Sequence, residues 1–282
     1  MLVERSDNVQ PRTIALPPVV SATRDPSAPG SQRPHHERPA HEHLESGLPG
    51  ATIAQAAAIF ENERRQVRID SLGADWMAAN AGFPQSRARR TVKRLFDVAA
   101  SAALLIATLP VMLLTALLIA AESGGPVLYF QKRVGQRGRV FTIFKFRSMR
   151  TDAELDGRPR WADVDDCRVT RVGRVIRRLR IDELPQIFNV FSGDMSFVGP
   201  RPERPFFVEQ LVSRIRHYEA RHCVKPGITG WAQVSYPYGA SHDDAVAKCQ
   251  YDLYYVKNHS LRLDLAILIG TVRVVLLGKG AR

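Results

Sequence analysis

VAASAALLIATLPVMLLTALLIAA, residues 98–121, runs without one charged side chain. At about 1.5 Å of rise per residue, a helix of this length can cross the hydrocarbon core of a bilayer. The run has no amphipathic period, which disfavours a helix buried in a soluble core. Pro110 lies near its middle, where a proline removes a backbone hydrogen bond and clashes with the preceding turn. The run therefore predicts a membrane helix that is kinked or broken at Pro110.

Basic side chains flank this run on both sides. They are Arg87, Arg89, Arg90, Lys93 and Arg94 before it, and Lys132, Arg133, Arg137 and Arg139 after it. Since basic residues favour the cytoplasmic side of a membrane, two basic flanks suggest a helix that enters and leaves by the same face. The alternative is an ordinary spanning helix with a mild kink. These residues alone weight the two arrangements equally.

Composition limits the remaining possibilities. Lys and Arg number 40 against 28 Asp and Glu, and the net charge of +12 suits an anionic partner. Three widely spaced cysteines exclude a disulfide scaffold and indicate a reducing, cytosolic environment. Residues 1–50 hold eight prolines and no apolar period, which predicts a disordered tail. Residues 51–90 are expected to form a helical linker of unknown role. Nucleotide-phosphate and dinucleotide loops and common hydrolase motifs are absent from the sequence.

The sequence after the apolar run predicts a β-hairpin and then a basic helix. Short aromatic and β-branched runs at 127–131 and 140–146 enclose turn residues, and Lys145 and Arg147 are expected on one face of the second strand. Their side chains suit either a solvated surface or a phosphate site. An amphipathic helix over 168–180 carries six arginines, Arg177 among them.

Asp182 and Glu183 follow the arginines at once. Asp182 fits an N-cap, with Pro185 in the first turn of a new helix. Adjacent carboxylates beside arginines also suit Mg²⁺ and phosphate, because Mg²⁺ takes one or two carboxylates plus phosphate oxygens. Both interpretations are open from the residues alone.

Two later loops offer anion-binding groups. Arg201 stands between Pro200 and Pro202, which restrict the backbone on both sides of it. The stretch 225–231, which includes Thr229 and Gly230, offers backbone donors. Residues 261–277 form a strongly apolar helix that is too short between its charges to span a bilayer. We expect that helix in the core or in the plane of the interface.

Taken together, these motifs resemble the monotopic polyprenyl-phosphate phosphoglycosyl transferases, a family of bacterial sugar transferases. The resemblance covers residues 91–282. The ending, from YPYG (236–239) through YYVKNHSL (254–261), looks most like the exopolysaccharide branch associated with exosortase systems. The motifs that carry it are KRLFD (93–97), FKFRSM (144–149), DELPQ (182–186), GDMS (193–196), GPRP (199–202) and PGITGWAQ (226–233).

The resemblance implies a fold and a reaction. The fold is α+β and mainly helical, with a re-entrant membrane helix at 95–121, a small β-hairpin and interfacial amphipathic helices. A sugar-1-phosphate passes from a UDP-sugar to undecaprenyl phosphate at the cytoplasmic face of the bacterial inner membrane, and UMP leaves. Asp182 is the expected nucleophile and magnesium ligand, and Glu183 assists it. Lys145, Arg147, Arg177, Arg201, Thr229 and Gly230 are the expected substrate-binding residues. Membrane lipids are expected partners, and a homodimer is an option that the sequence leaves open.

Two other classes compete with an enzyme. A basic nucleic-acid-binding protein would explain the arginines but has no use for the apolar run, so no nucleic acid is expected as a partner. A non-catalytic scaffold on anionic lipid would explain both features but needs no carboxylate pair at Asp182 and Glu183. The sequence therefore favours the transferase.

Overall fold

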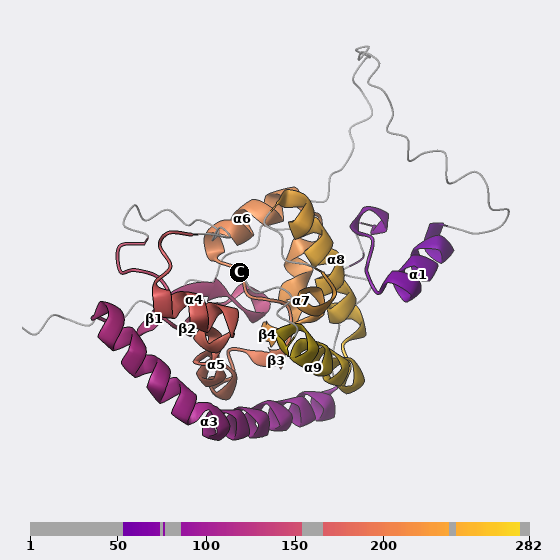
Figure 1. Cartoon of the computed structure of the whole chain (residues 1–282). Coiled ribbons are helices and arrows are strands. Elements are labelled where there is room, and N and C mark those ends of the chain that lie inside the picture. Colours follow the sequence, from indigo (N-terminus) through magenta and orange to yellow (C-terminus); the bar gives the residue numbers. More distant parts are fainter. Residues whose placement is uncertain (1–52, 74–75, 77–85, 154–165, 237–240, 277–282) are drawn as a thin grey trace, which may run out of the picture.

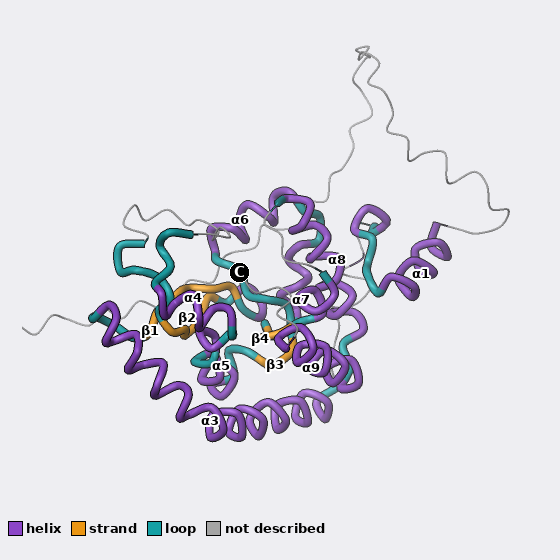
Figure 2. The backbone as a smooth tube through the Cα atoms, viewed as in Figure 1, coloured by secondary structure: helices purple, strands orange, loops and turns teal. Residues whose placement is uncertain are grey.

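The computed structural model describes residues 53–73, 76, 86–153, 166–236 and 241–276 (Figure 1). The predicted disordered tail, residues 1–50, lies outside the described residues. Most of the regular structure in these residues is helical, and there are two small sheets, so the fold is α+β (Figure 2). In chain order they are α1 (Ile53–Arg64), η2 (Ile69–Ser71), α3 (Arg87–Ser123), β1 (Leu128–Val134), η3 (Gln136–Gly138), β2 (Val140–Phe146), α4 (Arg171–Arg178), η4 (Ile181–Glu183), α5 (Gln186–Ser192), β3 (Ser196–Val198), α6 (Pro205–Arg214), η5 (Tyr218–Cys223), β4 (Gly227–Thr229), α7 (Trp231–Ser235), α8 (His242–Asn258) and α9 (Leu261–Leu276).

Helix α3 contains the whole apolar run and begins earlier than the predicted 95–121. It starts after Ser86, whose hydroxyl accepts a 3.3 Å hydrogen bond from the backbone N–H of Arg89. The helix continues through Pro110, and Figure 1 shows it bent into an arc along one side of the molecule. Only 17% of its most apolar stretch of 18 residues is buried. Among the described residues it is the one helix that is long and apolar enough to cross a membrane. The helix is therefore bent, and it is not broken at Pro110.

Both ends of α3 are fastened to the same body of helices and strands. Near its start, the Arg94 guanidinium donates to the carbonyls of Val190 and Phe191 at 2.6 and 2.7 Å, which completes the C-terminal end of α5. At its other end, the Glu122 carboxylate accepts from the N–H groups of Arg171 and Val172 at 2.8 and 3.1 Å, which caps the start of α4. The helix therefore lies along the domain and does not project from it.

The predicted β-hairpin is confirmed. Strands β1 and β2 pair antiparallel from Leu128↔Phe146 to Val134↔Val140. Helix α5 extends the edge of β2 through one side chain, because the Asn189 amide accepts from Phe144 N–H at 3.0 Å and donates to the Thr142 carbonyl at 2.7 Å. These two hydrogen bonds to the backbone of β2 fix the position of α5 beside the strand that carries Lys145.

A second sheet occurs where the sequence indicated only loops. Strands β3 and β4 pair parallel, with Ser196 opposite Gly227 and Val198 opposite Thr229. Three-residue strands are too short to show a period, and so sequence patterns do not find them. Glycines let these backbones approach closely, since a Cβ at Gly199 or Gly230 would lie under 3.0 Å from backbone atoms of the facing segment.

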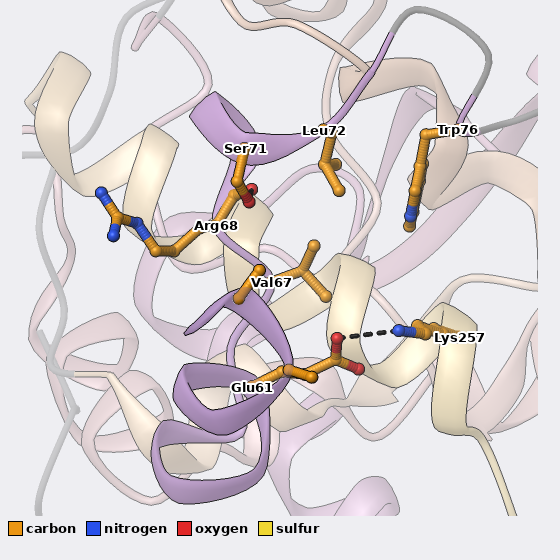
Figure 3. Close-up of a pocket in the computed structure, with 9 residues that line it drawn as sticks. Glu61, Val67, Arg68, Ser71, Leu72, Trp76 and Lys257 are labelled. Carbon is orange, nitrogen blue, oxygen red and sulfur yellow. Dashed lines mark hydrogen bonds and ion pairs between the residues drawn. The ribbon is translucent and has the colours of Figure 1, made fainter. Parts of the chain in front are cut away.

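The segment before α3 is packed against the rest of the fold. Val67 and Ile69 are buried in a cluster with side chains of α6, η5 and α8. The Trp231 indole donates to the Arg65 carbonyl at 2.9 Å, and Glu61 forms a 2.8 Å ion pair with Lys257 at the end of α8. Figure 3 shows the pocket that this segment encloses with α8, with Glu61 and Lys257 joined across its floor. Within the helical linker predicted over residues 51–90, α1 is helical over Ile53–Arg64.

Several shorter helices are amphipathic, with one apolar face left exposed. Helix α9 buries Ile267 completely while its other face is open to solvent, as expected for a core or in-plane helix. The exposed apolar side chains on these helices are Val175 of α4 and Leu179 directly after it, Phe188 and Phe191 of α5, and Leu261, Leu265, Ile269 and Val272 of α9. Helices α4 and α5 both contact α3, so part of this apolar surface adjoins the long helix.

The close approach of β3 to β4 can be tested by Gly230→Ala. The added methyl group would collide with the Gly199 carbonyl, which cannot move without breaking the strand pairing. Overpacking of this kind costs about 1–3 kcal/mol of stability. The midpoint of thermal unfolding in detergent measures the loss. Gly73→Ala is the matched control, because a Cβ at Gly73 meets no atom within 4 Å.

Candidate active site

Asp182 and Glu183 lie in the short turn η4, between α4 and α5. Helix α4 begins at Arg171 with Thr170 as its cap, so it is shorter than the predicted 168–180. Arg180 then adopts a left-handed conformation at φ 58°, which ends the helix and turns the chain into η4. A left-handed arginine is strained relative to glycine, and such strain is commonly found at functional sites.

Asp182 is not a helix cap. The residue at the N-cap of α5 is Pro185, and no side chain caps either η4 or α5. The first turn of α5 therefore gives no structural role to Asp182, and the capping interpretation is wrong. Both Asp182 and Glu183 are nevertheless buried, with exposed fractions of 9% and 8%.

Glu183 is held by cations from three segments. Its Oε1 atom lies 3.1 Å from Lys145 Nζ on β2 and 2.7 Å from Arg201 Nη2 in the loop after β3. Arg180 Nη1 is 3.9 Å away. Burial alone would raise the pKa of Glu183, but Arg201 and Lys145 outweigh it and hold that pKa well below its ordinary value. Glu183 is therefore ionised and fully engaged.

Asp182 differs from its neighbour in having no partner. Within the part of the chain that the structure describes, no hydrogen bond or ion pair ends on its carboxylate. Burial, and then the adjacent charge of Glu183, raises the pKa of Asp182 to about 6, although Lys145, Arg180 and Arg177 oppose the rise. A partly desolvated carboxylate without a partner is available to a ligand or a reaction.

The charges around these carboxylates favour an anion. Lys145, Arg177, Arg180 and Arg201 outnumber the two carboxylates, so the site is positive overall. The guanidinium of Arg177, in the last turn of α4, has no hydrogen bond or ion pair among the described residues, and its positive charge acts on Asp182. Guanidinium groups bind phosphate oxygens bidentately, which suits a diphosphate.

Arg147 lies apart from this cluster. It follows β2 by one residue, so the alternation of the strand does not place it beside Lys145. Its Nη2 donates to the Ser123 hydroxyl at 2.7 Å and to the Gly124 carbonyl, at the C-terminal end of α3. Two of its buried nitrogens lack a partner among the described residues. The contacts of Arg147 fasten the long helix, and its binding of substrate stays a prediction.

Thr229 and Gly230 support the loop that carries Arg201. The Thr229 carbonyl accepts from Gly199 N–H at 2.9 Å, and its hydroxyl lies 2.7 Å from that of Thr271 on α9. Gly230 packs its backbone on Gly199. These contacts are within the protein, so a role in substrate binding also stays a prediction for both residues.

The sequence did not single out two residues that shape the site. They are Asn189, which joins α5 to β2, and Arg180, which turns the chain into η4. In the sequence, Asn189 is an ordinary helix residue and Arg180 is one arginine of a run. Arg180 carried a usable signal, since the last position of a basic helix directly before an acidic pair is where a turn must occur. Asn189 carried none, because its partners Thr142 and Phe144 are remote in sequence.

Residues 88–278 match the bacterial sugar transferase family. Over 191 residues the chain is 52% identical to a UDP-N-acetylgalactosamine-undecaprenyl-phosphate N-acetylgalactosaminephosphotransferase of Aeromonas hydrophila, with 68% of this chain and 45% of that protein covered. It is 46% identical over 195 residues to an undecaprenyl-phosphate glucose phosphotransferase of Komagataeibacter xylinus, with 67% of this chain and 36% of that protein covered. It is 41% identical over 190 residues to the exopolysaccharide production protein PSS of Rhizobium leguminosarum bv. phaseoli, covering 64% and 93%. The matched region thus spans less than half the length of the first two relatives.

The unpaired state of Asp182 predicts a pH-dependent gain in stability for Asp182→Asn. The pKa of Asp182 is about 6 in the folded chain and ordinarily 3.8. Ionised Asp182 therefore lowers the free energy of unfolding above about pH 6, and this loss of stability disappears as the pH falls towards about 4. The asparagine variant should be more stable than the native chain at pH 8, by on the order of 2–3 kcal/mol. At pH 4 the two should be nearly equal.

Thermal unfolding in detergent and EDTA at both pH values measures this difference. Asp70→Asn, at an exposed carboxylate in η2, is the control and should change little at either pH. An Asp182→Asn variant that is less stable than the native chain at pH 8 would show that stabilising contacts hold the carboxylate.

Proposed function

The chain belongs to the bacterial sugar transferase family, and we propose that it transfers a sugar-1-phosphate from a UDP-sugar to undecaprenyl phosphate. UMP is released, and the lipid-linked sugar begins the assembly of an exopolysaccharide or another glycan. The observation that carries this proposal is the contrast between the two carboxylates. Glu183 is neutralised by Lys145 and Arg201, whereas Asp182 is unpaired in the same positive site.

Asp182 acts as the nucleophile in the first step. One of its carboxylate oxygens attacks the β-phosphorus of the UDP-sugar, and the bond from that phosphorus to the bridging oxygen of UMP breaks. The product is an acyl-phosphate that carries the sugar. In the second step a phosphate oxygen of the lipid attacks the same phosphorus, and Asp182 leaves as a carboxylate. Two steps suit a soluble donor and a membrane-bound acceptor, because UMP departs before the lipid arrives.

The residues fit a magnesium ion. Asp182 offers a carboxylate oxygen without a competing partner, and the described residues contain no group of three or more His, Cys, Asp or Glu that would form a complete protein cage. Mg²⁺ commonly binds through one or two carboxylates together with substrate phosphates, which matches this arrangement. When bound, the ion neutralises charge on the diphosphate and on the departing UMP.

The cations have two tasks in this proposal. Lys145 and Arg201 keep Glu183 ionised and in place beside Asp182, where it assists by positioning. The Arg177 guanidinium has no partner among the described residues and its charge acts on Asp182, so it holds the donor diphosphate. Fixed positive groups aimed at a phosphoryl centre are the usual means by which proteins stabilise such transfers.

We further propose that α3 enters and leaves one leaflet of the bacterial inner membrane from its cytoplasmic face. The contacts of Arg94 and Glu122 support this, because they fasten both ends of the helix to one domain. A straight span would carry those ends to opposite sides of the membrane. The exposed apolar faces of α4, α5 and α9 would then lie in the interface, which keeps the carboxylates near the headgroups.

The covalent intermediate can be trapped. Native protein incubated with a UDP-sugar that is labelled in both the sugar and the β-phosphate, without lipid acceptor, should retain both labels and release one UMP per chain. Asp182→Asn should retain neither label and should lose at least about 10³-fold in turnover. Mass spectrometry of the digested protein locates the label. Retained labels in Asp182→Asn would rule out Asp182 as the nucleophile, and Asp70→Asn serves as the unchanged control.

Membrane topology can be tested by cysteine labelling from each side. In a background with Cys167 and Cys223 replaced by alanine, single cysteines at Arg90 and Arg137 should both react only from the cytoplasm. A cysteine at Leu117, which is 69% exposed yet lies in the apolar run, should react with no membrane-impermeant reagent. Labelling of position 90 or 137 from the periplasm would show that the helix spans. Pro110→Ala should favour the spanning arrangement.

A further inference from the structure

The loop Pro200–Glu203 presents Arg201 to Glu183, and its shape is fixed in an unusual way. Prolines occupy two of its four positions, and a proline has no N–H to donate. The loop is instead held by its carbonyl oxygens, all four of which accept a hydrogen bond. The donors are Gly227 N–H to Pro200 at 3.0 Å, Arg221 Nη2 to Arg201 at 2.8 Å, Arg133 Nη1 to Pro202 at 3.0 Å and Val134 N–H to Glu203 at 2.9 Å.

Arg221 is the donor that bonds to the carbonyl of Arg201 itself. It lies in η5 and is 5% exposed. Its Nε and Nη2 donate to Asp252 Oδ2 on α8 at 3.1 and 2.7 Å, and its Nη1 donates to the Tyr218 hydroxyl at 2.6 Å. Every nitrogen of the guanidinium therefore has an acceptor, and the orientation of the group is set by Asp252 and Tyr218.

Stability alone is a poor explanation for this buried pair. Taking Arg221 and Asp252 out of water costs about as much as their attraction returns, and apolar residues of the same size often do as well. The planar fork does supply geometry, because one group can bond to the carboxylate and to a carbonyl at fixed angles. The carbonyl that it reaches belongs to the residue whose side chain holds Glu183, at 2.7 Å.

We propose that Arg221 is a positioning residue for Arg201, oriented by Asp252 and Tyr218. The carbonyl bond sets the backbone at Arg201, which directs its guanidinium to Glu183 and so fixes the carboxylate beside Asp182. This inference rests on the proposed function, because it assigns a purpose to the geometry of that site. Small displacements of about 1 Å in such groups can lower catalytic rates about 100-fold.

A double-mutant cycle tests the inference. Asp252→Asn keeps the size of the side chain but removes the charge that orients Arg221, and it should lower the rate of UMP release about tenfold while KM changes little. In an Arg201→Ala background the same substitution should cost less than about twofold, because the group that is being positioned is gone. Arg221→Lys, which keeps the charge but loses the planar fork, should behave like Asp252→Asn.

A purely structural role predicts different results. Asp252→Asn would then cost the same factor in both backgrounds, and that outcome, or an unchanged rate with Arg201 present, overturns the proposal. Glu61→Gln is the control, since it removes an ion pair at the end of the same helix α8, away from the loop, and should leave the rate unchanged.

The four proteins of the cycle are the native chain, Asp252→Asn, Arg201→Ala and the double variant. Their thermal unfolding midpoints can also be measured, and these do not depend on the reaction. The midpoint shift of the double variant should be smaller than the sum of the two single shifts. If the native chain released no UMP from any UDP-sugar, the proposed function would fail. The coupling between the midpoint shifts of Asp252→Asn and Arg201→Ala would still test whether Arg221 positions Arg201. Additive midpoint shifts would count against it.

Discussion

The ion pairs of Glu183 are the constraint on which the rest of the site depends. A buried carboxylate is costly unless it is paired, and Glu183 is paired by a strand residue, Lys145, and a loop residue, Arg201. These contacts join β2, η4 and the loop after β3, which are far apart in the chain. Once they are formed, the adjacent Asp182 is buried as well but is left without a partner. The low pKa of one carboxylate and the raised pKa of the other are two results of the same packing.

The long helix imposes the second constraint. An apolar helix with most of its surface exposed needs an apolar environment, yet both its ends are fastened to the polar domain by Arg94 and Glu122. The same two contacts complete α5 and α4, which carry the turn with Asp182 between them. The part that meets the lipid and the part that holds the carboxylates are therefore built from shared hydrogen bonds, and a shift of α3 would disturb the site.

The comparisons and the structure support each other at different levels. The family match covers α3 to α9, and the relatives' names concern transfer to undecaprenyl phosphate or exopolysaccharide production. Neither the family match nor the relatives' names describe how Arg201 is held. The structure adds that point, since Arg221, Arg133 and two backbone N–H groups bond to consecutive carbonyls of a loop whose prolines leave it few donors of its own.

The sequence by itself determined the local features. The apolar run predicted the long helix, turn residues predicted the hairpin, and short motifs indicated the family, because each of these patterns lies in residues that are close along the chain. Tertiary structure decided the rest. It separated Arg147 from Lys145, which the strand alternation had placed together, and it paired β3 with β4, whose strands are too short for a period. It removed Asp182 from a capping role and joined Arg221 to Asp252. Contacts between residues remote in sequence depend on packing, and one sequence carries no periodic signal for them.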